Sequence, residues 1–321
     1  YVPGMVEMMK EKGFAHMSEG ALVVDVKEDT DTKEIPPCII LKSDGASLYS
    51  TTDLATLVMR MKENNPDRVI YLADARQSMH FIQVFRCARK TGIVPDTTEL
   101  VHIGFGTMNG KDGKPFKTRD GGVMRLEYLL KEIDDEMLNK IKENQKEKEN
   151  LNIDEAEAEQ TAKTVALAAV KYGDLSNQAS KDYIFDIDRF TSFEGNTGPY
   201  ILYTIVRIKS ILSKYEAKGG DISALKDAIM PAVNAGQKNL MLSLAKFNAT
   251  IESAYEESAP HKICAYIYEL ANAFNGFYHD TKILSEENEE LKKSYISLLV
   301  LTKEILEACI DMLGFSAPDR M

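Results

Sequence analysis

The sequence predicts an α/β portion with a partial parallel sheet, followed by an all-α bundle. In the first third, short strand-like runs alternate with amphipathic helical runs, at lengths that fit parallel strands joined by right-handed crossovers. From about Leu126 onward, the pattern of apolar residues becomes helical. The two patterns together predict at least two structural regions, in agreement with a length of 321 residues.

Three buried strands are predicted in the α/β portion, with a helix in each interval. The strands are Cys38–Leu41, Val69–Ala73 and Leu100–Phe105, and the helices cover residues 51–64 and 77–92. They make half of a doubly wound, Rossmann-like sheet. The usual partner half is not found, because the sequence contains neither GxGxxG nor GxxxxGK[ST]. The chain also starts at Tyr1, inside a predicted helix, so we expect it to be a portion of a longer protein.

The helical part contains long amphipathic segments. The charged segment at residues 127–150 is expected to be an exposed helix that serves as a solvated connector. A helix with Asp154 as its cap and Gly173 at its end follows, and then a loop-like segment reaches Tyr200. The last two helices have apolar stripes at Ile263, Ile267, Leu270, Phe274 and Phe277, and at Leu291, Tyr295, Leu298, Ile305 and Cys309. These stripes predict a helical bundle.

Composition excludes several classes of protein. No run of 18 apolar residues occurs, and no secretory signal is visible, so we expect a cytoplasmic protein without membrane contact. The cysteines Cys38, Cys87, Cys264 and Cys309 have no metal-binding spacing, and we expect reduced thiols in the core and no metal site. A net charge of -11 argues against a strongly basic nucleic-acid binder but allows a local basic groove.

Two clusters of polar residues follow predicted strands, where open α/β sheets bind ligands. Tyr49 and Asp53 are four residues apart after the first strand, and a carboxylate there suits a cationic group. Asp53 could instead only favour the amino end of its helix. Gln77 and His80 follow the second strand. Gln77 can hydrogen-bond a polar substrate, whereas His80 can line the pocket or serve the core.

A third cluster is the stretch HIGFGTMNGKDGKPFKTRDGG, which begins within the third predicted strand. The main chain of Gly104, Gly106 and Met108 would lie at the sheet edge, where small residues let a flat ring approach. The loop that follows is cationic, and such a loop can close on phosphates and stabilise charge that develops during group transfer. The alternative is an ordinary basic hairpin.

These clusters together resemble the arginyl-tRNA synthetase family of class I aminoacyl-tRNA synthetases. Six segments match the family in order: SDGASLYSTTDLA, YLADARQSMHFIQVF, HIGFGTMNGKDGKPFKTRDGG, VKYGDLS, DYIFDIDRFTSFEGNTGPY and LGFSAPDRM. The resemblance implies a ligase that activates arginine with ATP, accompanied by Mg²⁺, and transfers it to tRNA-Arg. It also implies half a catalytic domain at residues 1–150, a helical connector at 151–199 and an anticodon-binding domain at 200–321.

The resemblance assigns roles to individual residues. Tyr49, Asp53 and Gln77 would hold the arginine substrate, with Asp53 as the partner of its guanidinium group. KPFKT resembles the family's KMSKS loop, in which Lys114, Lys117 and Thr118 would contact ATP and Lys117 would be the main stabiliser of the phosphates. The residues expected to flank the adenine are His102, Gly104, Phe105, Gly106 and Met108.

Two departures from the family pattern limit these assignments. HIGF at His102 is one letter from the class I HIGH signature, but it follows the arginine-binding segments, whereas HIGH belongs early in the catalytic domain. We interpret HIGF as a coincidence and expect the HIGH segment and the family's N-terminal tRNA-contacting domain to be absent. In the last helix, Ser294 and Tyr295 replace the family's usual arginine–leucine pair. No anticodon contact is therefore assigned, although Tyr255, Tyr266 and Phe277 could either stack on bases or pack in the core.

The leading interpretation is a C-terminal portion of a monomeric arginine–tRNA ligase, with little or no activity by itself. The competing interpretation is a non-catalytic paralogue that binds RNA or a protein. Such a paralogue is expected to have lost the family's residues at catalytic positions, but these residues are intact here. A different nucleotide-dependent transferase would leave FEGNTGPY and the helical tail unexplained. A portion of an enzyme should also expose an unpaired, apolar sheet edge where its partner half belongs.

Overall fold

The computed structural model describes residues 1–114, 125–147, 154–225 and 228–321. The chain forms two compact units, unit 1 (Tyr1–Thr107) and unit 2 (Met108–Met321). Each unit has a hydrophobic core of its own. Within the described ranges, no helix is long and apolar enough to cross a membrane. The expected functional boundaries at residues 150 and 199 stay a prediction.

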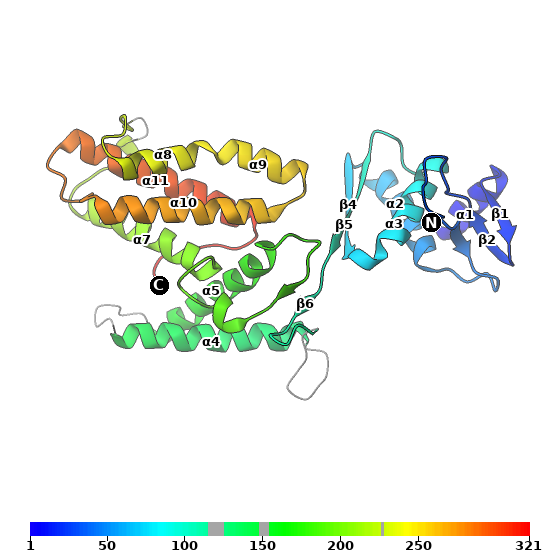
Figure 1. Cartoon of the computed structure of the whole chain (residues 1–321), viewed down its shortest axis with the longest axis horizontal. Coiled ribbons are helices and arrows are strands. Elements are labelled where there is room, and N and C mark those ends of the chain that lie inside the picture. The colour runs from blue at the N-terminus through cyan, green and yellow to red at the C-terminus, as the bar shows by residue number, and fades with distance from the viewer. Residues whose placement is uncertain (115–124, 148–153, 226–227) are drawn as a thin grey trace. The chain divides into compact units, whose positions relative to one another are not determined.

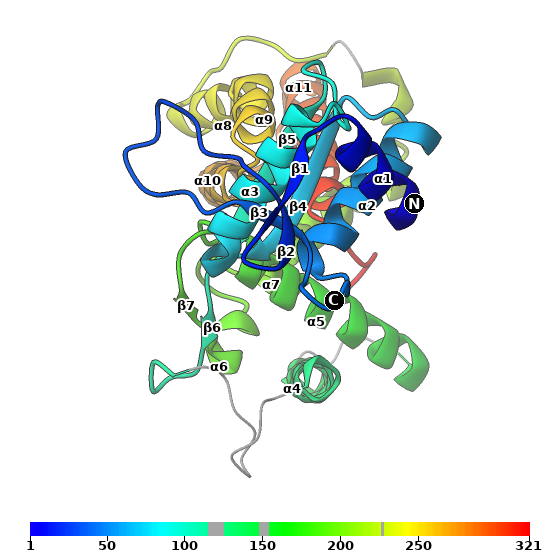
Figure 2. The same ribbon diagram turned by 90° about the vertical axis from the view of Figure 1, so that its right-hand side faces the viewer.

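Unit 1 begins with a helix and a small antiparallel sheet. Its first elements are α1 (Val2–Glu11), β1 (Ala15–Ser18), β2 (Ala21–Val24) and β3 (Cys38–Leu41). Glu19 and Gly20, with φ of 50° and 83°, form the two-residue turn between β1 and β2. β3 pairs antiparallel with β2, so that Cys38 lies opposite Val24. The prediction that Cys38–Leu41 joins the parallel strands is therefore wrong, because the unpredicted hairpin offers β3 another edge (Figure 2).

The parallel part of unit 1 is one pair of strands with its crossover. The elements are α2 (Tyr49–Glu63), β4 (Arg68–Asp74), η1 (Ala75–Gln77), α3 (Ser78–Lys90) and β5 (Glu99–Phe105). β4 and β5 pair in parallel from Arg68 opposite Glu99 to Asp74 opposite Phe105. Side chains alternate across such a sheet. Val69 enters the core beside Phe85 of α3 and Leu100, whereas Ile70 and Leu72 point the other way and are 44% and 71% exposed.

The exposed side of β4 is an apolar surface. Besides Ile70 and Leu72, Phe105 at the end of β5 is 45% exposed. Among the described strands, β4 has β5 as its one hydrogen-bonded neighbour, so its other edge is unpaired. This apolar, unpaired edge is the feature expected of half a parallel sheet.

Unit 2 is helical apart from one short strand pair (Figure 1). Its elements are β6 (Met108–Asn109), α4 (Leu126–Glu147), α5 (Glu155–Leu175), β7 (Tyr183–Ile184), α6 (Ile187–Phe190), α7 (Gly198–Ala217), η2 (Ser223–Leu225), α8 (Ala235–Ala245), α9 (Phe247–Glu256), α10 (Pro260–Asp280) and α11 (Glu289–Met312). β6 and β7 pair in parallel. The apolar stripes predicted for α10 and α11 enter the core, where Phe274, Phe277 and Leu298 are fully buried.

Helix α4 is part of the core of unit 2. Leu129, Ile133, Met137 and Ile141 recur every fourth residue and are buried beside α5. The prediction of a solvated connector is therefore wrong for this helix. Charged residues dominate its composition, and those whose side chains are described are exposed or half-buried.

Most of the predicted core residues are buried. All four cysteines are buried and none forms a disulfide. Tyr266 and Phe277 are 5% and 0% exposed, which confirms core packing over base stacking for both. Tyr255 is 69% exposed.

Candidate functional site

The candidate site in unit 1 centres on a carboxylate at the start of α2. Ser50 and Thr51 donate hydrogen bonds of 2.5 Å and 2.6 Å to the carbonyl oxygens of Ile39 and Ile40 in β3, which fix the amino end of the helix on the strand. Asp53 follows in the second turn. Its Oδ2 lies 2.6 Å from Nε2 of His80 in α3, and each side chain is about a quarter exposed, at 28% and 25%. The carboxylate is therefore held in place while part of it still faces solvent.

The structure resolves the two roles that the sequence leaves open for His80. Its ring also packs edge-on against Phe81, with centroids 5.0 Å apart. His80 thus both contacts the core and orients Asp53. A carboxylate has about four lone-pair positions, and the contact with His80 uses one of them, so Asp53 retains capacity for a cation.

Tyr49 and Gln77, the other predicted arginine-binding residues, lie at the edges of this region. Tyr49 is the first residue of α2, one helical turn before Asp53, and is 85% exposed. Gln77 is exposed at the end of η1, directly before α3. The structure brings Asp53 and His80 into contact, whereas Tyr49 and Gln77 present their side chains to solvent.

Beneath Asp53, a buried aromatic cluster contains two polar atoms without partners. Phe81 stacks on His102 at 4.5 Å and lies 5.0 Å from the ring of Tyr71. Nε2 of His102 and Oη of Tyr71 are buried and have no hydrogen-bond partner among the described residues. Burial raises the pKa of Tyr71 to about 12. The stacking contact with Phe81 places the ring of His102 against α3, on the face of the sheet that the helices cover.

The predicted adenine-flanking residues divide between the two units. Gly104 packs so closely that a Cβ atom there would lie 2.9 Å from Cα of Ala75, so the strand and η1 require glycine at this position. Phe105 and Gly106 complete the unit 1 part, and Met108 belongs to unit 2.

The described part of the lysine-rich loop is a tight turn in unit 2. The main-chain N–H of Lys114 donates to Oδ1 of Asp112 at 3.1 Å, and the N–H of Gly110 donates to the carbonyl oxygen of Lys114 at 2.8 Å. Lys111 bridges Asp186 and Asp188 at 3.0 Å each, which ties this turn to α6. Lys117 and Thr118 lie outside the described residues.

A second cluster, which the sequence did not single out, lies on α7 and α10. We call it the tyrosine–arginine cluster and define it as Tyr200, Tyr203, Arg207, Asn275 and Tyr278. The guanidinium carbon of Arg207 lies 4.7 Å and 5.3 Å from the ring centroids of Tyr203 and Tyr278, and its Nη1 donates to Oδ1 of Asn275 at 2.6 Å. Nδ2 of Asn275 in turn donates to the hydroxyl of Tyr200 at 2.9 Å.

This cluster combines flat rings, a guanidinium group and amides on a partly exposed surface. Tyr278 is 41% exposed, and Tyr200, Tyr203 and Arg207 are half-buried. Such a surface can stack bases and hydrogen-bond their edges. The spacing of Tyr200, Tyr203 and Arg207 places them on one helical face and could have revealed it, whereas Asn275 is 68 residues away from Arg207.

Comparison with models of known protein families identifies the family of the chain. Residues 1–187 match the family model described as "tRNA synthetases class I (R), catalytic domain", where R denotes arginine. The chain belongs to the arginyl-tRNA synthetase family. Residues 201–321 match a second model, the DALR anticodon binding domain. The family and the fold class predicted from the sequence are thereby confirmed.

Relatives within this family are longer than the chain. It is 53% identical over 321 residues to an arginine–tRNA ligase of Alkaliphilus oremlandii, of which it covers 53%. It is 42% identical to that of Francisella tularensis, again covering 53%. The chain thus spans about half the length of the curated relatives it matches.

Solved arginyl-tRNA synthetases have the same fold. The whole chain superposes on 52% of the Plasmodium falciparum enzyme with a TM-score of 0.82 and 26% identity. It superposes on 58% of the Thermus thermophilus enzyme with a TM-score of 0.81 and 22% identity, a likeness of fold alone.

Proposed function

We propose that the chain supplies half of the catalytic domain and the anticodon-binding domain of an arginine–tRNA ligase. In the reaction, a carboxylate oxygen of arginine attacks the α-phosphorus of ATP, and pyrophosphate leaves with the electrons of the broken P–O bond. The adenylate then passes its arginyl group to a ribose hydroxyl at the tRNA 3′ end, and AMP leaves. Mg²⁺ would accompany ATP and would neutralise part of the phosphate charge.

The observation that carries the catalytic part is the Asp53–His80 pair. The arginine substrate has a planar guanidinium group, which pairs with a carboxylate through two parallel hydrogen bonds. His80 orients Asp53, and Asp53 remains 28% exposed, so it can receive this group. Tyr49, one turn away, and Gln77, after β4, are proposed to hold the rest of the amino acid.

The nucleotide is proposed to contact His102, Gly104, Phe105, Gly106 and Met108 through its adenine. Lys114, Lys117 and Thr118 would contact its phosphates, where ammonium groups stabilise the charge that develops on the leaving pyrophosphate. The HIGH segment that supplies the other ATP contacts in this family does not occur in the sequence. We therefore propose that the 321 residues alone have little or no aminoacylation activity.

A chimaeric enzyme tests the arginine site directly. The matched half of the Alkaliphilus oremlandii ligase is replaced by this chain, and arginine-dependent exchange of pyrophosphate into ATP is measured. We expect exchange in the chimaera and a loss of at least about a hundredfold in kcat/KM for arginine with Asp53→Asn, because a neutral amide has one acceptor oxygen and cannot form the bidentate, charged pair with the guanidinium group. Asp96→Asn, at an exposed carboxylate in the loop before β5, is the matched control.

Two outcomes of that experiment would contradict the proposal. An Asp53→Asn chimaera with undiminished exchange would remove Asp53 from the arginine site. Robust arginylation of tRNA by the 321-residue chain without its partner half would contradict the proposed inactivity.

The tyrosine–arginine cluster is proposed to bind bases of the anticodon loop. Its support is the combination of partly exposed tyrosine rings with the Arg207 guanidinium group, within the residues that match an anticodon-binding model. Arg207→Ala should weaken binding of a tRNA-Arg transcript, whereas Arg320→Ala, which removes an ion pair with Glu157, should not. A chimaera that binds tRNA-Arg but shows no arginine-dependent exchange would favour the non-catalytic paralogue.

A further inference from the structure

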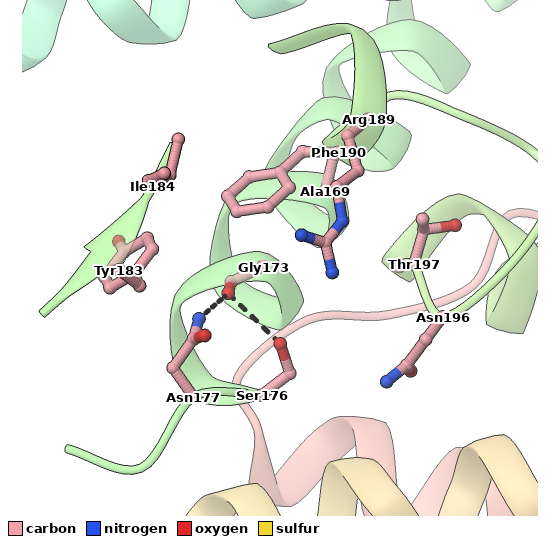
Figure 3. A pocket seen from close by; sticks show the side chains of 11 residues that line it. Ala169, Gly173, Ser176, Asn177, Tyr183, Ile184, Arg189, Phe190, Asn196 and Thr197 are labelled. Carbon is pink, nitrogen blue, oxygen red and sulfur yellow. Dashed lines mark hydrogen bonds between the residues drawn. The ribbon is translucent and has the colours of Figure 1, made fainter. Parts of the chain in front are cut away.

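A pocket in unit 2, separate from the tyrosine–arginine cluster, has the lining of an anion site. It has a volume of about 310 Å³ and lies between the carboxyl end of α5, the β7–α6 segment and the amino end of α7. Arg189 is the one charged residue among those that line it. Figure 3 shows its guanidinium group pointing into the space between Gly173 and Asn196.

The guanidinium group of Arg189 is not used within the described structure. No described residue forms a hydrogen bond or ion pair with it, although the carboxylates of Asp174, Asp186 and Asp188 lie in neighbouring segments. Asp186 and Asp188 are both paired with Lys111, and Asp174 accepts the hydroxyl hydrogen of Tyr183 at 2.7 Å. Five donors in a planar fork are therefore available to a ligand, and they match the oxygens of a phosphate.

Asn196 adds further donors on the opposite wall. Its Oδ1 accepts a hydrogen bond of 2.5 Å from the buried hydroxyl of Tyr172, which also lies 2.9 Å from the carbonyl oxygen of Cys264. Because this contact occupies the oxygen, the amide nitrogen of Asn196 keeps its two N–H groups for the pocket. An anion thus meets hydrogen-bond donors from two sides.

The remaining lining fits a ribose and a base. Nδ2 of Asn177 donates to the carbonyl oxygen of Gly173 at 2.6 Å, so its Oδ1 is left as an acceptor for a hydroxyl group. The rings of Tyr183 and Phe190 form an aromatic wall, with centroids 6.4 Å apart. A ribonucleotide offers all three complements, namely a phosphate, a hydroxyl donor and a flat ring.

We propose that this pocket binds the phosphate of a ribonucleotide, with Arg189 as its principal contact. The phosphate can come from the backbone of a bound tRNA or from a free mononucleotide. The tRNA source rests on the function proposed above. Thr197, the N-cap of α7 at the pocket, and Arg207 in the tyrosine–arginine cluster are ten residues apart, roughly 15 Å of helix rise. One RNA stem–loop can span that distance.

The RNA arm of the test uses the purified 321-residue chain and a tRNA-Arg transcript. Affinity is measured over a series of salt concentrations for the wild type, Arg189→Ala, Arg189→Lys, Arg207→Ala and Arg320→Ala. With the backbone as ligand, Arg189→Ala lowers affinity about fivefold to tenfold and reduces the slope of log K against log salt by about 0.7 to 0.9. Arg189→Lys retains the slope, because it keeps the charge. Arg320→Ala, which also removes one arginine charge from unit 2, leaves both quantities unchanged.

The nucleotide arm uses 5′-AMP and inorganic phosphate, followed by NMR of the Asn177 and Asn196 side-chain amides. With a free nucleotide as ligand, AMP shifts both signals saturably in the wild type and not in Arg189→Ala, and it does so at lower concentration than phosphate. Equal binding of phosphate and AMP would overturn the nucleotide assignment.

The combined outcomes separate this proposal from the function proposed above. If tRNA affinity falls with Arg189→Ala but not with Arg207→Ala, the pocket proposal is supported and the anticodon assignment is contradicted. If tRNA affinity falls with Arg207→Ala but not with Arg189→Ala, and AMP does not bind, the pocket proposal is overturned and the anticodon assignment stands. Circular dichroism of Arg189→Ala checks that the fold is retained, as expected for an exposed side chain.

Discussion

At the scale of single residues, glycines decide how closely the elements of unit 2 approach. A Cβ atom at Gly198, the first residue of α7, would lie 2.3 Å from the carbonyl oxygen of Ala168 in α5. A Cβ atom at Gly173 would lie 2.5 Å from the ring of Phe190. The first clash is with backbone, which cannot rotate away, so α7 and α5 cross at this distance only because residue 198 lacks a side chain.

Gly198→Ala is therefore expected to destabilise unit 2 by about 1 to 3 kcal/mol, the usual cost of overpacking. Gly276→Ala is the control, because a Cβ there, in the helix α10, would meet no atom within 4 Å beyond its own stretch of helix. It should stabilise the protein by up to about 1 kcal/mol, since alanine has the higher helix propensity. Urea denaturation followed by circular dichroism measures both changes. Equal stability of the two variants would refute the close-packing argument.

Residue types were more predictable from the sequence than residue partners. Asp53 and His80 were each singled out by their positions after strands, but their contact joins residues 27 apart in the sequence. That contact depends on how α2 packs against α3, which no local pattern encodes. The same holds for Ser294, whose hydroxyl accepts the N–H of Met230 at 2.9 Å, from a segment 64 residues away.

At the scale of elements, Arg86 of α3 holds the loop between β2 and β3 through a bidentate ion pair. Nη1 and Nη2 of Arg86 lie 2.7 Å and 2.8 Å from the two carboxylate oxygens of Asp31. Arg86 also donates to the carbonyl oxygen of Val26 at 3.2 Å. The bidentate pair with Arg86, assisted by the main-chain N–H of Glu28, lowers the pKa of Asp31 to about 2.

This pKa predicts an acid-dependent part of the stability of unit 1. The folded-state pKa of about 2 is below the ordinary value of 3.8, so the contribution is complete above pH 4 and is lost as pH falls toward 2. Arg86→Gln should make the denaturation midpoint of unit 1 less steeply dependent on pH between 4 and 2. Lys10→Gln, in the last turn of α1, is the control. Parallel pH profiles for the wild type and Arg86→Gln would contradict the assignment.

Elements with long regular patterns were predicted well, and short ones were not. The apolar stripes of α10 and α11 predict both that these segments are helices and which face of each is buried, because many residues repeat the same spacing. The four-residue strands β1 and β2 are too short to show a period, and β1 is also of mixed polarity, so neither is predicted from the sequence and β3 is placed in the wrong sheet. Helix α4 was recognised as a helix, but its single apolar stripe was hidden by its charge.

At the scale of the whole molecule, unit 1 exposes an apolar surface to water, which is energetically unfavourable. Ile70 and Leu72 of β4 are exposed next to an unpaired strand edge. Exposed strands of this kind pair with other chains unless something covers them. We therefore predict that the purified chain associates with itself in a concentration-dependent way.

Leu72→Lys should reduce this association, because a charge on an exposed strand opposes pairing. Leu242→Lys in α8 provides a matched control, since Leu242 is also exposed, at 55% against 71% for Leu72. Sedimentation velocity over a range of concentrations measures the effect. Association that persists in Leu72→Lys, or that disappears in Leu242→Lys, would show that the surface of β4 is not responsible.

Through its hydrogen bond to Asn196, Tyr172 in the hydrophobic core influences which ligands the pocket at the surface binds. Tyr172 is fully buried, yet its hydroxyl determines which end of the Asn196 amide faces outward. With phenylalanine in its place, the amide would be free to turn by half a rotation and present its oxygen, which repels anions. The preference of a cavity for negative or positive ligands would then change without any substitution among the residues that line it. Two relatives with identical linings but different cores could accordingly prefer opposite charges.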